Sequence, residues 1–447
     1  MKIDNKTQPA IRTPEAIAVP LAEMQTLSNG VRLYTLDCSD HDVVRFSFVF
    51  HAGTAMQSVP FSASSTANLL SEGTQRHSAQ QIAEILDYHG SFFEVTIDRD
   101  YAVINFASLL KYFPQTLAMA SEIVLHPTFA QDEVTLYCEK RKQRLAVERS
   151  KATMKARELF GTALFGAEHP YGVSYDESLY DDLTREDVVE FYKRHYTAGN
   201  CFVVCSGRVG EREREMIAEV AARIPVGVSA GHASASLSDQ STRGGEVAAS
   251  VEFPTPHSTP FAFRAHEGAV QSSVRMGVLL FPRTHPDFIA MQVLCTVLGG
   301  YFGSRLVRNL REKHGYTYGA FASMATLEHA GYMAIATEVA TEATQDAIAQ
   351  IFSEIERLRT EPVGGEELQM VKNIMTGEVM RILDGPFGIA DVTIENVSNG
   401  TTNDYNDRWL AEVRDITPER LLDVARRYLP PDAFTTVVVG DKSLYGD

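Results

Sequence analysis

Arg311 and Tyr318 are the residues of this chain that most clearly could do chemistry, and they lie seven residues apart within 310–319. Arginine is a permanent cation and tyrosine a phenolic donor, so the pair suits a carbonyl oxygen or the oxyanion that develops when a peptide bond is attacked. Gly315 separates the two residues, so helical spacing cannot place them side by side, whereas a helix–turn–strand can. From the residues alone, a local structural hydrogen bond is the simpler interpretation of the pair.

The groups that would start such a reaction are missing from the sequence. No two of the thirteen histidines are four residues apart, so neither H-E-x-x-H nor H-x-x-E-H occurs. Residues 227–231 match G-x-S-x-G, but a nucleophile elbow needs a strand before it and a helix after it. These residues fall instead in a stretch without periodicity. The sequence therefore carries groups that could stabilise a reaction but none that could begin it.

A glycine-rich run, residues 299–304, follows a predicted helix and contains Gly299, Gly300 and Gly303. Two interpretations stay open for it. The run can be the end of the helix and a turn, or a loop that guides an extended ligand.

The elements that would position these residues occur twice. Residues 183–207 align without gaps with 416–440, at an offset of 233. Each segment predicts a threonine N-cap with an acidic residue two positions later, an amphipathic helix, a turn, and an apolar strand that ends in glycine. The strand-like runs 44–51 and 274–281 agree with the same repeat. We therefore expect a duplicated chain.

The repeat sets the expected domains: an N-terminal extension (1–24), a first α+β half (25–225), a linker (226–261) and a second α+β half (262–447). In the first half, Ser78 opens a helix with a capping box, residues 93–103 alternate as a hairpin, and a long charged helix is predicted over 131–165. Strands and helices do not alternate strictly. The predicted fold is α+β, with each half a mostly antiparallel sheet and helices packed on one face.

The composition of the chain argues against some classes of binding partner and indicates a cellular compartment. The net charge is 41 − 58 = −17, which disfavours nucleic acid and anionic membranes as partners and is common in soluble proteins. The five scattered cysteines indicate free thiols and a reducing compartment. The N-terminus has no apolar core of a signal peptide, and no 18-residue apolar run predicts a membrane span. The sequence as written predicts a cytoplasmic protein, or a periplasmic one if a leader has been removed.

The duplicated halves, Leu-Arg-Glu-Lys-x-Gly-x-x-Tyr in the second half and Ser-Ala-Gln-Gln in the first together resemble the pitrilysin-type (inverzincin) metallopeptidases. Within that family the chain is most similar to bacterial relatives of mitochondrial processing peptidase. The resemblance extends from about 25 to 443 and includes Glu-Gly-Thr at 72–74 and His-Pro-Tyr-Gly at 169–172.

Active members of this family carry H-x-x-E-H shortly before the Gly-Thr. Counted back from Gly-Thr, the motif falls on residues 64–68, so the two zinc ligands become Ser64 and Asn68 and the base becomes Ala67. The third ligand, a glutamate, falls at about Arg144, where a cation would repel zinc. The resemblance therefore implies no metal or other cofactor in this chain.

The resemblance also implies a role for the second half. In the family, an arginine and a tyrosine of the half without zinc reach the active site, and Arg311 and Tyr318 match them. The expected function is a non-catalytic subunit of a heterodimeric zinc endopeptidase, inactive alone. A homologous partner with H-x-x-E-H would supply zinc, and the substrate would be a peptide or unfolded polypeptide. Gly299, Gly300 and Gly303 match only loosely the substrate loop of processing-peptidase relatives.

Two other functions remain open. The chain could be a catalytically silent scaffold, like the core subunits of respiratory complexes that share this fold, or a free-standing peptide-binding protein.

Overall fold

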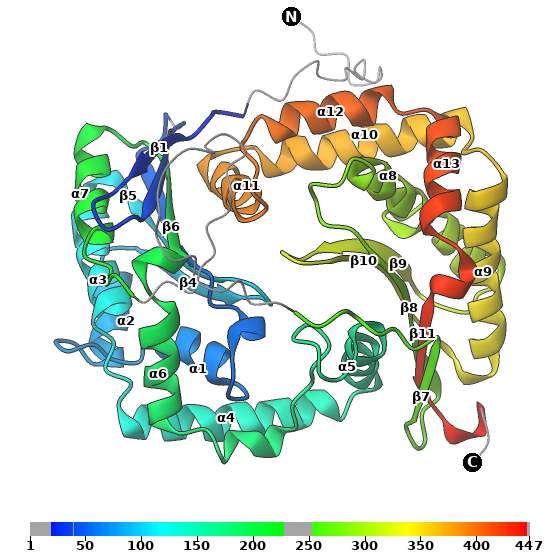
Figure 1. The fold of residues 1–447 in the computed structure, drawn as a ribbon, viewed down its shortest axis with the longest axis horizontal. Helices are drawn as coiled ribbons and strands as arrows, with labels where there is room; N and C mark the ends of the chain where they lie inside the picture. Colours follow the sequence, from blue (N-terminus) through cyan, green and yellow to red (C-terminus); the bar gives the residue numbers. More distant parts are fainter. Residues whose placement is uncertain (1–18, 39, 228–252, 445–447) are drawn as a thin grey trace, which may run out of the picture.

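The structure, a computed structural model, describes residues 19–38, 40–227 and 253–444. It consists of two α+β halves whose sheets stand on opposite sides of the molecule (Figure 1). Residues 228–231 of the G-x-S-x-G run and most of the expected linker lie outside the described residues, as does most of the expected N-terminal extension. A first strand already begins at Glu23.

The first sheet has the strand order β1-β2-β6-β3-β5-β4. Its strands are β1 (Glu23–Thr26), β2 (Arg32–Asp37), β3 (Val43–Phe50), β4 (Phe92–Ile97), β5 (Ala102–Leu109) and β6 (Cys201–Gly207). All neighbouring strands are antiparallel except β2 and β6. The outer face packs on α1 (Ser62–Leu69), α2 (Ala79–Tyr88), α3 (Phe113–Leu125), α4 (Gln131–Arg149), α6 (Arg185–His195) and α7 (Glu211–Ala221).

The second sheet repeats this topology in the order β7-β11-β8-β10-β9, again with one parallel pair, β7 and β11. Its strands are β7 (Phe261–Ala265), β8 (Gln271–Leu280), β9 (Ala320–Thr326), β10 (Gly331–Ala340) and β11 (Thr435–Gly440). It packs on α8 (Phe288–Gly299), α9 (Thr344–Thr360), α10 (Gly365–Ile382), α12 (Tyr405–Asp415) and α13 (Pro418–Tyr428). The predicted α+β fold of two homologous halves is confirmed.

The local sequence signals of the repeat are confirmed as well. Thr184 caps α6 by accepting a hydrogen bond from the Asp187 amide, and Thr417 caps α13 in the same way through the Arg420 amide. The capping box at Ser78 and the antiparallel hairpin of β4 and β5 are also present. All five cysteines are free, and four of them are buried.

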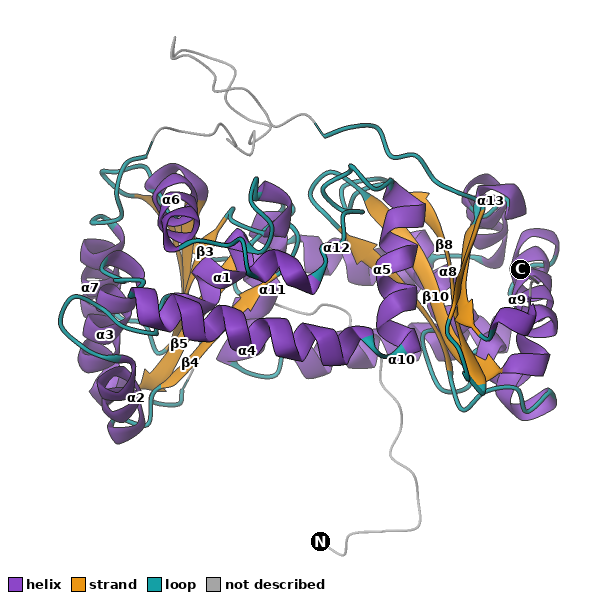
Figure 2. Cartoon of the chain, turned by 90° about the horizontal axis from the view of Figure 1, so that it is seen from below, coloured by secondary structure: helices purple, strands orange, loops and turns teal. Residues whose placement is uncertain are grey.

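One helix from each half crosses to the other half. Helix α5 (Ala152–Phe165) packs on the inner face of the second sheet, and α11 (Pro386–Ser398) packs on the inner face of the first (Figure 2). The prediction of a single helix over 131–165 is therefore wrong, because two helices, α4 and α5, cover these residues. The predicted helix divides after Arg149 because α4 stays on the first half while α5 leaves for the second. Arg149 holds this corner through ion pairs with Glu158 and Glu177 at 3.1 and 2.6 Å.

The turn between β9 and β10 joins the second half to the first. Glu328 in this turn pairs with His51 at the end of β3, with 2.7 Å between Oε2 and Nε2. The buried Asp100 carboxylate accepts hydrogen bonds from the Glu328 amide at 2.9 Å and from the Tyr171 hydroxyl at 2.6 Å. These contacts of the first half hold the Thr326 end of β9, and Tyr318 lies just before the other end of this strand.

His195, at the end of α6, predicts a pH dependence of stability. Burial lowers the pKa of His195 to about 4, and the charges of Arg194 and His51 add to this effect. The unfolded chain titrates near the ordinary value of 6.5, so it binds more protons than the folded chain between these pH values. We expect the free energy of unfolding to decrease as the pH falls from about 6.5 to about 4.

Urea unfolding at pH 7 and at pH 5 measures this effect. His195→Phe, which keeps a ring beside Phe191, should lose less stability over this interval than the wild type. The exposed His257, changed to Phe, is the matched control and should behave as the wild type does. An unchanged pH dependence in His195→Phe would mean that other groups are responsible.

Candidate functional site in the second half

Arg311 and Tyr318 lie side by side in the structure, on a helix–turn–strand segment. Arg311 belongs to a π-helical turn, η5 (Val307–Lys313), which ends before Gly315, and Tyr318 precedes β9. Gly315 has φ +68°, a backbone conformation that glycine adopts without strain. The Arg311 Cζ lies 4.8 Å from the centroid of the Tyr318 ring. The contact is a cation–π interaction and not the hydrogen bond that the simpler interpretation predicts.

Phe302 completes this site. The Arg311 Cζ also lies 4.8 Å from the Phe302 ring centroid, so the guanidinium contacts two aromatic rings. Phe302 and Tyr318 are 69% and 87% exposed, which places both rings on the protein surface. Sequence reasoning missed Phe302, because the run 299–304 holds two adjacent aromatic residues, Tyr301 and Phe302, and the sequence does not indicate that Tyr301 packs on the core while Phe302 faces Arg311.

The backbone beneath these exposed side chains is firmly anchored. Arg305 is buried and forms a two-point ion pair with Glu367 of α10, at 3.1 and 2.8 Å. The Asn309 amide donates to Glu354 of α9 at 2.7 Å. Charge-assisted pairs of this kind are stronger than ordinary hydrogen bonds. The turn that carries Arg311 is therefore fixed to the helices behind it.

Tyr318 is held in the same way by its chain neighbours. Thr317 Oγ1 accepts a hydrogen bond from the Gly319 amide at 3.1 Å and another from Thr337 Oγ1 of β10 at 3.0 Å. Two residues before Tyr318, the Tyr316 hydroxyl donates to Asp346 of α9 at 2.5 Å. The phenol of Tyr318 thus projects outward from a backbone that is hydrogen-bonded on both sides.

The glycine-rich run has a packing reason of its own. Helix α8 ends at Gly299, where a Cβ atom would lie 2.4 Å from the amide nitrogen of Ala322 in β9. A larger residue at this position would push the helix away from the strand. The same run places Phe302 on Arg311. The interpretation as a helix end and turn is therefore confirmed, and the loop that guides an extended ligand stays a prediction.

The positions expected to have lost a metal site lie in the first half. Ser64, Ala67 and Asn68 are on α1, where the Asn68 amide donates to the Ser64 carbonyl at 2.7 Å. Arg144 on α4 is largely exposed and pairs with Glu148 at 2.8 Å. Among the residues that the structure describes, no three His, Cys, Asp or Glu side chains could hold a metal ion together. An amide, a hydroxyl and a cation do not fit a zinc ion.

Aromatic residues lie around Ser64, in the first turn of α1. The Phe61 and Tyr180 rings stack with centroids 3.9 Å apart, and the Tyr137 hydroxyl donates to the Ser64 carbonyl at 3.4 Å. Burial raises the pKa of Tyr137 well above its ordinary value, so this phenol stays neutral. Packed rings, hydroxyls and the Arg141 cation beside Tyr137 and Tyr180 occupy this region.

Comparison with known proteins places these observations in a family. A model described as "Peptidase M16 inactive domain" matches residues 182–375, and one described as "Insulinase (Peptidase family M16)" matches residues 65–167. An uncharacterized zinc protease of Rickettsia felis is 21% identical over 359 residues, which cover 79% of this chain and 82% of that protein.

Two solved structures have the same fold. A peptidase M16 inactive domain from Pseudomonas fluorescens superposes with a TM-score of 0.83 at 19% identity, over 94% of this chain and 98% of that one. A protease from Helicobacter pylori gives 0.79 at 17% identity, over 94% and 99%. The two family models together match well over half of the sequence, and the chain belongs to the M16 peptidase family.

Proposed function

We propose that this chain is the non-catalytic subunit of a two-chain zinc endopeptidase and that it contributes Arg311 and Tyr318 to the active site of its partner. The observation that supports this most directly is the exposed Tyr318 phenol on an anchored backbone, beside a guanidinium held by two rings. A phenol on a fixed backbone that is nevertheless exposed to solvent suits a contact with the carbonyl oxygen of a substrate bound by another subunit.

The chemistry of the pair fits the attack on a peptide bond. As water adds to the scissile carbonyl, negative charge develops on its oxygen, and a positioned phenol can donate a hydrogen bond to it. The neighbouring Arg311 cation favours the same charge and keeps the Tyr318 ring in place. Zinc and the general base would come from a homologous partner that carries H-x-x-E-H, because the matching positions here hold Ser64, Ala67, Asn68 and Arg144.

The substrate class follows from the same proposal. An extended peptide or unfolded polypeptide would be enclosed between the two subunits. The glycine-rich run, with Gly299, Gly300 and Gly303, and the exposed Phe302 would lie beside this peptide. No helix among the described residues is long and apolar enough to cross a membrane.

Reconstitution tests the proposal. The purified chain should bind no stoichiometric zinc and cleave no peptide, whereas the chain mixed with a catalytic M16 subunit of the same organism should cleave unfolded polypeptides. Elemental analysis and a peptidase assay with and without a chelator measure both properties. Chelator-sensitive cleavage by the isolated chain would contradict the proposal. A stable complex with no gain in activity would support the scaffold function instead.

Arg311→Lys should lower kcat/KM of the reconstituted complex about tenfold or more. A lysine ammonium keeps the charge but lacks the planar group that lies between the Phe302 and Tyr318 rings. Arg308→Lys is the matched control, since Arg308 is exposed, pairs with Glu367 and lies one turn away. Equal activity of the two variants would show that the geometry of the guanidinium is unimportant.

A further inference from the structure

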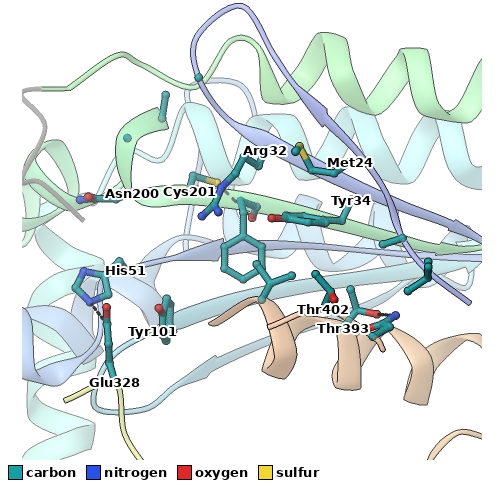
Figure 3. Close-up of a pocket in the computed structure, with 18 residues that line it drawn as sticks. Met24, Arg32, Tyr34, His51, Tyr101, Asn200, Cys201, Glu328, Thr393 and Thr402 are labelled. Carbon is teal, nitrogen blue, oxygen red and sulfur yellow. Dashed lines mark hydrogen bonds and ion pairs between the residues drawn. The ribbon is translucent and has the colours of Figure 1, made fainter. Parts of the chain in front are cut away.

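A cavity of about 720 Å³ lies between the inner face of the first sheet and helix α11. Met24, Arg32 and Tyr34 form one wall, Thr393 and Thr402 the facing wall, and the ion pair of His51 and Glu328 closes one end (Figure 3). Leu21 and Met24 at its border are 67% and 55% exposed. The cavity is therefore open to solvent and large enough for a small ligand.

Arg32 gives this cavity a positive charge. Its neighbour Leu33 is buried in the core beneath the outer helices, so the alternation of β2 directs Arg32 to the inner face. No carboxylate among the described residues pairs with Arg32. Glu328, the acidic residue of the described lining, is engaged by His51. In a chain of net charge −17, Arg32 is thus a half-buried cation that an anion would stabilise.

The rest of the lining supplies an apolar surface. Asn200 also lines the cavity, but its side chain is directed to α6, where its amide donates to the His195 carbonyl. Phe202 and Val397 present apolar side chains between the two walls.

We propose that this cavity binds the C-terminal end of a peptide. Arg32 pairs with the terminal carboxylate, and the last apolar side chain packs on Phe202 and Val397. A free carboxylate of this kind is what peptide hydrolysis creates, so the site suits a cleavage product. Binding itself needs no catalytic partner and holds even if the proposed function does not.

Calorimetric titration of the isolated chain tests this site with acetyl-Ala-Phe-Leu as the free acid and as the C-terminal amide. The acid should bind about tenfold tighter or more, the usual effect of a charge-assisted contact. Arg32→Gln should abolish this preference. Arg212→Gln, which removes an equal charge from the exposed surface of α7, should keep it.

A second variant and a second probe test the other contacts. Met24→Gln, at an exposed position that should not disturb folding, is expected to weaken the acid and the amide equally, by a few fold. Octanoate should bind more weakly than the peptide acid, because a single alkyl chain fills less of the cavity than three residues do. Equal binding of acid and amide, or a preference that survives in folded Arg32→Gln, would overturn the proposal. Tighter binding of octanoate would assign the cavity to fatty acids and overturn the peptide assignment.

Discussion

Tyr318→Phe in a reconstituted complex is expected to lower kcat about 100-fold, the usual effect of losing one donor to a developing oxyanion. Phenylalanine keeps the ring that contacts Arg311 and removes only the hydroxyl, so packing changes little. If the hydroxyl meets charge that exists only in the transition state, kcat and kcat/KM should fall together while KM stays nearly constant. Steady-state kinetics on a peptide substrate measures all three quantities.

Tyr316→Phe provides the matched control for this experiment. It removes the same atom two residues away, where the hydroxyl donates to Asp346 instead of facing solvent. This variant should lower the melting temperature slightly and leave kcat within a few fold of the wild type. A purely structural Tyr318 would give the same pattern as Tyr316. Full activity of a correctly assembled Tyr318→Phe complex would therefore remove the main support of the proposed function.

The sequence predicted those parts of the fold that local signals determine. The caps at Ser78, Thr184 and Thr417 each depend on residues within three positions, and the repeat made both sheets recognisable from the pattern of one. The adjacency of Arg311 and Tyr318 was predictable for a similar reason, because Gly315 marks a turn between a helix and a strand. Such features need no knowledge of distant contacts.

Contacts between distant segments explain what the sequence could not predict. Residues 150–151 contain neither glycine nor proline, yet the helix divides there because α5 packs on the second sheet and α4 on the first. The position of α11 was unpredictable for the same reason, because this helix belongs to the second half of the sequence but packs on the first sheet. Phe302 contacts Arg311 from nine residues away in the sequence, and Gly299 of the same run lets α8 approach β9 closely. Arg32 likewise appears unpaired only when both walls of the cavity are in place.

Asp287 connects the site to the core and leads to a prediction about stability. It is buried at the start of α8, the helix that leads to Phe302, and its carboxylate accepts hydrogen bonds from three residues of α13. Arg427 and Tyr428 donate at 2.9 and 2.7 Å, and Arg420 also pairs with it. Burial alone would raise the pKa of Asp287, but the Tyr428 hydrogen bond and the two arginines outweigh it and lower the pKa.

We expect Asp287→Ala to reduce the free energy of unfolding by about 3 kcal/mol, the lower end of the range for breaking a buried ion pair. The lower end applies because Arg420 and Arg427 are partly exposed and can regain water. Because the folded pKa is depressed, the carboxylate stabilises the folded chain above pH 4, and this contribution is lost as the pH falls through the folded pKa. Urea unfolding at pH 7 measures the difference.

Asp423→Ala is the matched control for Asp287→Ala, since Asp423 is exposed and pairs with the same two arginines. It should cost no more than about 0.5 kcal/mol, as exposed ion pairs do. Because Asp287 does not touch Arg311 or Tyr318, the folded Asp287→Ala subunit should retain kcat in a reconstituted complex below its melting temperature. An equal loss of stability in both variants would mean that burial of Asp287 is not what makes the cluster strong. A loss of kcat with unchanged stability would mean instead that the Asp287 carboxylate positions Arg311 and Tyr318 and does not stabilise the packing of α13 on α8.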